Sequence, residues 1–198
     1  MSSNPKYSSH ASAMRLPLLV SLLTAMTVLS GTSAAAAGTG VPRVVVNILV
    51  DQLRTDYLNA FMPLYGQEGF VRLLNEGRVY AQAEYPHYRP DRASAAATLA
   101  TGTTPYNHGI VALKWLDRET LRPVFCVNDK NYAGLQTTDA SSPTFLGVST
   151  VGDELKVATE GKALVYAIAP FRDAAILSAG HAADAAVWID DRTGQWCS

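Results

Sequence analysis

The order of hydrophobic and polar positions predicts an α/β protein. Residues 44–50 (VVVNILV) form a nearly unbroken β-branched and aliphatic run, which is typical of a strand buried on both faces of a parallel sheet. Apolar residues then recur at helical spacing over residues 53–62 and 66–76, and Gly77 is the predicted end of the second helix. A short strand over residues 78–83 would complete a βαβ unit with a right-handed crossover, and hence a layered α/β fold.

The second half of the chain continues in the same style. The Ala-rich segment 92–100 predicts a helix that Asp91 caps at its start and that Thr101-Gly102 ends. Two short apolar runs within residues 109–128, separated by a turn-like stretch over 117–123, predict a hairpin. The remaining pattern predicts a helix over 149–159 closed by Gly161, a buried strand over 163–168, further sheet segments over 174–177 and 185–189, and a turn over 190–194.

The N-terminal region has the pattern of an export signal. Met14-Arg15 precedes an apolar run over residues 18–29, and small residues over 30–37 follow that run. We therefore predict a secretory signal peptide over residues 1–37, with Met14 as a second candidate start, and a periplasmic or secreted product. A membrane anchor is the alternative, but the run is short for a span and is followed by small residues, not by a basic stop, so we expect no stable membrane insertion after processing.

Composition and charge narrow the classes of function. The chain has 198 residues, of which 48% are hydrophobic and 17% charged, as expected for one globular domain. Its net charge of −1, with basic and acidic residues scattered along the chain, disfavours duplex nucleic acid as a partner. An oxidising compartment would allow Cys126 and Cys197 to pair, but their positions do not decide whether they do, and they lack the spacing of a structural zinc site.

Asp51 directly follows the first predicted strand and is the first candidate for chemistry. In open α/β sheets, ligands bind at the carboxyl ends of strands, which makes an acid at that point a candidate site residue. Asp is also favoured as a helix N-cap, and a helix is predicted to follow. Position alone leaves the two interpretations equally weighted.

Several short motifs in a fixed order favour the site interpretation of Asp51 over the N-cap interpretation. Val50-Asp51-Gln52-Leu53-Arg54, Thr101-Gly102-Thr103-Thr104-Pro105 and Gly152-Asp153-Glu154-Leu155-Lys156, among others over residues 43–198, resemble the type I phosphodiesterase, nucleotide pyrophosphatase and alkaline phosphatase family. The resemblance implies a three-layer α/β/α sandwich of alkaline-phosphatase-like type, incomplete in this chain, so that residues 38–198 are the N-terminal part of such a domain. It also implies two zinc ions, phosphate-ester substrates and a metal-ligand role for Asp51.

The same resemblance shows departures at the positions that carry the chemistry. Relatives form a covalent intermediate on a Thr or Ser nine residues before the Thr-Gly block, and that position is Arg92 here. Arginine has no hydroxyl and stays charged, so Ser94, two residues on, is the candidate substitute, and Asp91, Arg92 and Ser94 would occupy the phosphoryl pocket. Leu113 stands where relatives have a phosphate-binding Asn.

A basic pair and most metal ligands are also missing. The Lys-x-Arg pair of relatives corresponds to the stretch Phe171-Arg172-Asp173, and the family's other zinc ligands lie beyond the point where this sequence stops. One carboxylate does not hold two zinc ions, because each needs about three protein ligands. His87, His108 and His181 are dispersed, and we expect each to be a turn or packing residue.

These departures lead to two hypotheses. The first is a phosphoester hydrolase relative that is inactive as a fragment and does not retain zinc. The alternative is a non-catalytic exported domain for interaction or anion binding, in which Arg89, Arg92 and Arg172 would clamp an anion.

Overall fold

The computed structural model describes residues 43–85, 87 and 90–198. The chain divides into two units, residues 1–47 and 48–198, and the first unit is described only from residue 43. The predicted signal peptide over residues 1–37 lies outside the described residues. Within the described ranges, none of the helices combines the length and the apolar character needed to cross a bilayer.

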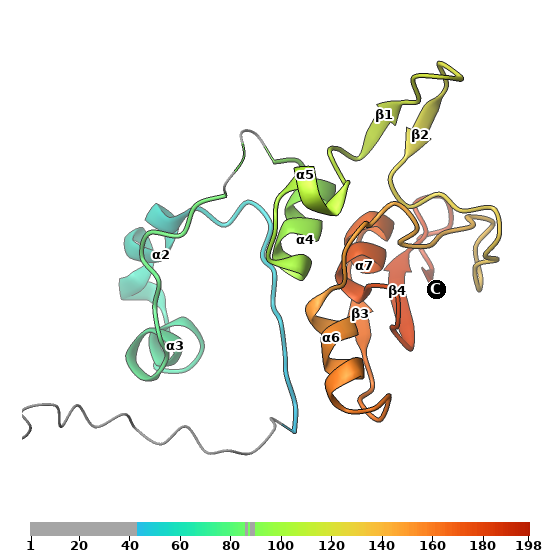
Figure 1. Cartoon of the computed structure of the whole chain (residues 1–198). Helices are drawn as coiled ribbons and strands as arrows, with labels where there is room; N and C mark the ends of the chain where they lie inside the picture. The colour runs from blue at the N-terminus through green and yellow to red at the C-terminus, as the bar shows by residue number, and fades with distance from the viewer. Residues whose placement is uncertain (1–42, 86, 88–89) are drawn as a thin grey trace, which may run out of the picture. The chain divides into compact units, whose positions relative to one another are not determined.

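Helices and short strands make up the second unit (Figure 1). The helices are α2 (Thr55–Ala60), η1 (Met62–Leu64), α3 (Phe70–Glu76), α4 (Arg92–Thr101), α5 (Pro105–His108), α6 (Val151–Ala158) and α7 (Arg172–Ala179). The strands are β1 (Lys114–Leu116), β2 (Pro123–Phe125), β3 (Tyr166–Ile168), β4 (Ala185–Ile189) and β5 (Trp196–Cys197).

Both helices predicted early in the chain are present as α2 and α3. Arg72 forms salt bridges to Glu68 and Glu76, one turn away on either side, which stabilise α3 locally. As predicted, α3 ends at Gly77, whose amide donates to the carbonyl oxygen of Leu73 at 3.0 Å. Neither helix contains a buried residue, so local signals rather than core packing account for them.

The two strands predicted around these helices are absent, which corrects the sequence analysis. In the first unit Val44, Val45 and Val46 are 55–78% exposed, and in the second unit Ile48, Leu49 and Val50 are 45–77% exposed. Residues 78–83 also form no strand. A strand requires the N–H and C=O groups of a neighbour, and the sheets of the described residues include neither segment.

A βαβ unit does form, but later in the chain. Strands β3 and β4 pair in parallel with α7 between them in sequence, and β5 adds to β4 in the antiparallel direction. The prediction of a sheet segment over residues 174–177 was therefore wrong, because these residues lie in α7. Its buried residues Ala175, Ile176 and Leu177 face the core, and a four-residue apolar run fits a buried helix as well as a strand.

Strand β3 confirms the predicted strand over 163–168 but not its burial. Helix α7 packs against β3 and β4. Tyr166 and Ile168 are nevertheless 61% and 72% exposed. The apolar character of these two residues predicted a strand buried on both faces of the sheet, but the described residues do not cover both faces.

Helix α4 packs beside α7 (Figure 1). Its Ala-rich face buries Ala93, Ala96 and Ala97 in a core that also contains Ile110 and Leu177. Small side chains allow the two helices to approach closely. The predicted hairpin is also confirmed, as β1 and β2 pair antiparallel from Lys114 opposite Phe125.

Helix α6 confirms the helix predicted over 149–159. Hydrogen bonds at its start also join it to the segment that follows α7. The Thr150 hydroxyl accepts from the amide of Asp153, and the Asp153 carboxylate accepts from the amide of Thr150. The same carboxylate accepts from the amide of Ala182 at 2.7 Å. Gly180 lies against this cluster with a φ of +84°, and a Cβ there would collide with the Thr150 hydroxyl.

Replacing Thr150 by Ala removes the buried cap and leaves the amide of Asp153 without its acceptor. We expect Thr150→Ala to lower the free energy of unfolding by about 1–2 kcal/mol. Urea denaturation followed by circular dichroism measures the loss. Thr138→Ala is the matched control, because Thr138 is exposed, and an equal effect of both variants would contradict the assignment.

Asp153 makes the fold sensitive to acid. Burial raises the pKa of Asp153, but the hydrogen bonds from Thr150, Ala182 and His181 outweigh it and lower the pKa from 3.8 to about 2. A depressed carboxyl pKa stabilises the fold above the unfolded-state pKa, and this contribution is lost as the pH falls through the folded-state pKa. We therefore expect stability to drop between pH about 4 and about 2, and to drop less in Asp153→Asn. Urea midpoints across this range check it, and an unchanged acid slope in the variant would refute it.

Candidate functional site

The N-terminus of α4 brings the predicted site residues Asp91, Arg92 and Ser94 into one helical turn. Asp91 is the N-cap, as predicted, and Gly102 ends the helix in the left-handed conformation that favours glycine. One Asp91 carboxylate oxygen, Oδ1, accepts from the amide of Ser94 at 2.8 Å. The other, Oδ2, accepts from the amide of Leu113 at 2.5 Å, so Asp91 also anchors the segment that leads into β1.

Ser94 completes the capping box and is 1% exposed. Its hydroxyl accepts from the amide of Asp91 at 3.0 Å and donates to the carbonyl oxygen of Asp91 at 3.2 Å. A nucleophilic hydroxyl needs an open approach and a base that takes its proton. In this conformation the Ser94 hydroxyl is enclosed and its proton is directed at the backbone.

Arg92 is the first residue of α4 and is bound to α7. Its Nε donates to Asp173 Oδ2 at 2.8 Å, and its Nη2 donates to Asp173 Oδ1 at 2.7 Å. The guanidinium also lies 3.8 Å from the centre of the Phe171 ring. The hydrogen bonds to Asp173 raise the pKa of Arg92 although burial opposes them, so the group stays charged.

Asp51 is exposed and follows the extended segment that ends at Val50. The alternative interpretation as a helix N-cap is wrong, because α2 begins at Thr55 and its N-cap is Arg54. The charge of Asp51 contributes to raising the pKa of Arg92, behind the larger effect of Asp173, and it adds to burial in raising that of Tyr85.

The described residues do not fit a zinc site. Zinc in proteins takes three or four ligands from His, Cys, Asp and Glu. Residues 43–85, 87 and 90–198 contain no cluster of three such side chains that could hold a metal ion. Asp51 on its own supplies one carboxylate.

Arg172 is the first residue of α7. Its Nη2 donates to Asn128 Oδ1 at 2.9 Å, its Nη1 lies 3.4 Å from an Asp139 carboxylate oxygen, and its guanidinium covers the Phe125 ring. Both arginines of the predicted anion clamp that the structure describes are thus paired with carboxylates. The third, Arg89, lies outside the described residues.

Two histidines occupy structural positions, in line with the expected packing roles. His108 is fully buried, and burial lowers its pKa. Because the amide of Ile110 donates to its Nδ1 at 3.1 Å, the proton lies on Nε2 and is donated to the Thr98 hydroxyl. His181 lies between the Asp153 carboxylate and the carbonyl oxygen of Leu146.

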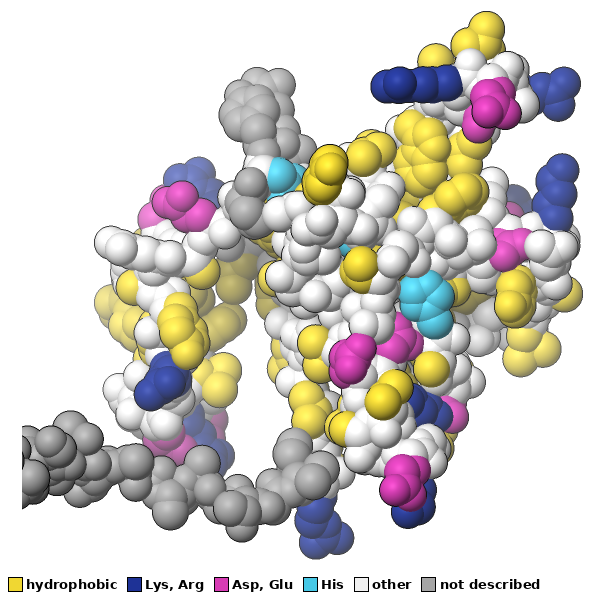
Figure 2. All heavy atoms as spheres, viewed as in Figure 1, with side chains coloured by type: hydrophobic (Ala, Val, Ile, Leu, Met, Phe, Trp, Pro, Cys, Tyr) yellow, Lys and Arg dark blue, Asp and Glu magenta, His cyan; other side chains and the backbone are white. Residues whose placement is uncertain are grey.

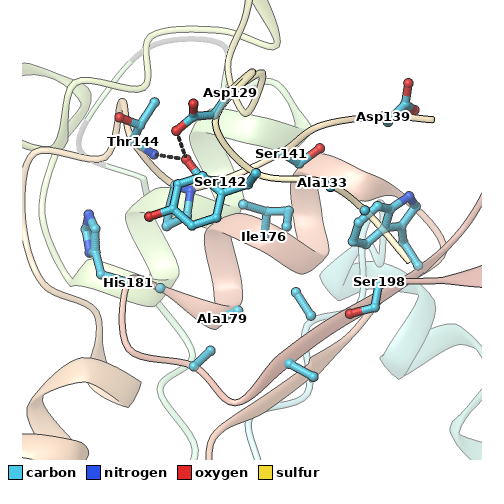
Figure 3. A pocket seen from close by; sticks show the side chains of 18 of the residues that line it. Asp129, Ala133, Asp139, Ser141, Ser142, Thr144, Ile176, Ala179, His181 and Ser198 are labelled. Carbon is cyan, nitrogen blue, oxygen red and sulfur yellow. Dashed lines mark hydrogen bonds between the residues drawn. The ribbon is translucent and has the colours of Figure 1, made fainter. Parts of the chain in front are cut away.

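A cavity of about 970 Å³ lies elsewhere, between the 129–144 loop, the end of α7 and β4 (Figure 3). Ile176 and Ala179 contribute apolar surface to it, and Asp139 and His181 contribute polar groups. The Ser142 hydroxyl donates to Asp129 and accepts from the amide of Thr144, which fixes one wall (Figure 3). The lining described for this cavity includes none of the predicted site residues.

The residues that sequence reasoning missed are the partners of Arg92. Asp173 and Phe171 were recognised as lying where relatives have a basic pair, but their contact with Arg92 was not predicted. The sequence held one signal for this contact, which is a reversal of charge. Asp173 stands in the stretch where relatives have a basic pair, and Arg92 stands where they have a hydroxyl.

Comparison with known proteins establishes the family. Residues 45–194 match the family model described as type I phosphodiesterase / nucleotide pyrophosphatase. The chain belongs to this family. The predicted resemblance is thereby confirmed, and the motifs quoted above for residues 50–54, 101–105 and 152–156 lie within the matched range.

Several relatives of this family are similar to the chain over most of its length. It is 37% identical over 160 residues to alkaline phosphatase PhoV of Synechococcus elongatus, and 35% identical over 175 residues to alkaline phosphatase PafA of Elizabethkingia meningoseptica. These matches cover 79% and 85% of the chain but 29% and 32% of the relatives. The chain thus spans about a third of the length of these relatives.

Solved structures of the family confirm the fold class. The crystal structure of wild-type PafA matches with a TM-score of 0.71 and 34% identity, over 74% of this chain and 29% of that one. A PafA mutant matches with a TM-score of 0.72. The chain is therefore an α/β fold of alkaline-phosphatase-like type, present in part.

The two cysteines yield a test of this region. Both are free thiols and are buried. Burial, with the charges of Asp173 and Asp91, raises the pKa of Cys126 to about 12, and burial also raises the pKa of Cys197. A thiol reacts as its thiolate, so we expect iodoacetamide to label neither cysteine in the folded chain and both in urea without reductant. Mass spectrometry counts the adducts, and rapid labelling of folded Cys126 would contradict the described packing.

Proposed function

We propose that this chain is a phosphoester hydrolase relative that does not hydrolyse phosphate esters by itself. The observation that supports this most is the identity and bonding of Arg92 at the start of α4. The family resemblance expects a nucleophilic hydroxyl there, at a helix N-terminus that favours an anion. Arg92 has five N–H donors and no acceptor, and two of those donors are committed to Asp173.

The candidate substitute Ser94 has little support from its surroundings. Catalysis would require the Ser94 hydroxyl to leave the capping box, which would break its two hydrogen bonds with the backbone of Asp91. The half-buried amide of Asp91 would then lose its acceptor, which costs on the order of 1 kcal/mol. The position thus favours stability of the helix over reactivity.

The donor set around Asp51 also supports a non-catalytic chain. The named relatives are alkaline phosphatases, and the family chemistry relies on zinc to polarise the phosphoryl group. The described residues contain no cluster of ligands that would hold such a zinc pair. Asp51 would serve as one ligand only where other ligands are brought to it.

We also propose a periplasmic or secreted location. The proposal is supported by the basic start, apolar run and small residues over positions 14–37. The mature chain would then begin near residue 38, just ahead of the matched range.

An interaction domain is a second candidate function, and exposed aliphatic side chains favour it. On the face shown in Figure 2, hydrophobic side chains are exposed among mixed acidic and basic groups. Val44, Leu64 and Leu164 are among the most exposed. The anion-binding version has less support, because the Arg92 and Arg172 guanidinium groups already face the carboxylates of Asp173 and Asp139.

The test combines metal content with turnover on the purified full chain. We expect less than stoichiometric zinc by elemental analysis and no hydrolysis of p-nitrophenyl phosphate, because one carboxylate does not hold the metal pair. Arg92→Thr should not create activity, since it supplies a hydroxyl without metal ligands.

The proposal fails if the wild-type chain hydrolyses the ester and Asp51→Asn abolishes that activity. Asp56→Asn is the matched control, because Asp56 is a nearby exposed acid paired with Arg54. Turnover that persists unchanged through Asp51→Asn and Ser94→Ala would come from a contaminating phosphatase.

A further inference from the structure

At three positions this chain departs from the family pattern, and the residue at one of them, Arg92, contacts the residues at the other two. Arg92 stands at the nucleophile position, and Phe171 and Asp173 stand in the stretch that matches the Lys-x-Arg pair. The guanidinium of Arg92 binds both carboxylate oxygens of Asp173 across 81 positions of sequence and stacks on Phe171. Independent decay of an unused site would not be expected to produce complementary groups at the same place.

Arg92 and Asp173 change whether this region needs a bound anion to balance its charges. A hydroxyl facing two basic groups is electrostatically satisfied when an anion such as phosphate is present. One cation, one anion and an aromatic face satisfy each other without a ligand. The charge reversal at Asp173 therefore matches the charge gained at Arg92.

We propose that Arg92, Phe171 and Asp173 form one structural unit, the α4–α7 bridge, which replaces a ligand-dependent phosphate site by a ligand-independent ion pair. The inference deepens the proposed function and rests on its assignment of Arg92 to the nucleophile position. The bridge joins the helix that carries Asp91 and Ser94 to the helix that covers β3 and β4.

Burial makes the bridge energetically significant. The Asp173 side chain is 2% exposed and that of Arg92 is 30% exposed. Among the described residues, Arg92 supplies the side-chain hydrogen bonds that the Asp173 carboxylate accepts. Removing Arg92 alone would leave a buried charge uncompensated, which costs far more than losing an exposed ion pair.

The chain contains a matched control for this difference. Arg54 binds Asp56 with the same two-pronged geometry, Nε to Oδ1 at 2.9 Å and Nη2 to Oδ2 at 2.6 Å. Its side chains are 64% and 60% exposed. The two pairs share chemistry and geometry and differ in burial and in sequence separation.

A double-mutant cycle on the full chain tests the bridge. We expect Arg92→Met to lower the folding equilibrium constant on the order of 100-fold, and Arg54→Met to lower it by less than about fivefold. Adding Asp173→Leu to Arg92→Met should recover on the order of tenfold or more, because the buried charge is removed with its partner. Phe171→Leu should cost about two- to fivefold through the lost cation–π contact. Urea denaturation of all variants supplies these values.

Inorganic phosphate distinguishes the bridge from an anion site. The bridge predicts that phosphate leaves the thermal midpoint of the wild-type chain unchanged, since Arg92 is already occupied. Phosphate stabilisation of the wild type that is lost in Arg92→Met would overturn the proposal, as would additive effects of Arg92→Met and Asp173→Leu. Where Arg92→Met does not fold, a cycle of Arg92→Lys with Asp173→Glu measures the same coupling with a smaller loss of stability.

The outcome is separable from that of the proposed function. Stability coupling between positions 92 and 173 is measured without substrate, and ester hydrolysis is measured on the same preparations. A coupled pair in a chain that hydrolyses esters would refute the proposed inactivity and support the bridge. An uncoupled pair in an inactive chain would refute the bridge alone.

Discussion

The ion pair between Arg92 and Asp173 is the contact on which the rest of the described site depends. It fixes the first turn of α4 against the first turn of α7. From that turn Asp91 anchors the amide of Leu113, and α7 in turn covers β3 and β4. The ion pair adds a directional contact to a core in which the side chains from α4 are alanines, because small side chains pack closely but provide little directional information.

Local signals in the sequence were sufficient for several elements. The cap at Asp91, the stop at Gly102 and the turn between β1 and β2 are each determined by a few neighbouring residues, so a sequence pattern predicts them. Strand formation over residues 44–50 was not predictable in this way. An apolar run reveals a tendency toward burial, whereas a strand also needs a partner that lies elsewhere in the chain. Ala174–Leu177 shows the complementary problem, since four apolar residues carry no period that separates strand from helix.

Sequence reasoning grouped the candidate site residues together but did not predict their hydrogen bonds. Asp91, Arg92 and Ser94 share the first turn of α4, and the family resemblance implied a hydroxyl at the position that Arg92 occupies. The pairing with Asp173 was not, because contacts between residues so far apart in sequence follow from the packing of α4 on α7. Asp51 illustrates a different limit: its place after an apolar run agreed with the family pattern, but the ligands that would accompany it are not among the described residues.

Gly180 limits how this protein can diverge. A side chain at Gly180 would overlap the Thr150 hydroxyl and the Asp153 carboxylate, and the backbone there adopts a conformation that other residues rarely accept. A descendant of this sequence could exchange most residues of the α7–β4 connection through gradual drift. Replacing Gly180 would require the start of α6 to be rebuilt in the same step, so we expect sequence variation along this connection to spare the glycine.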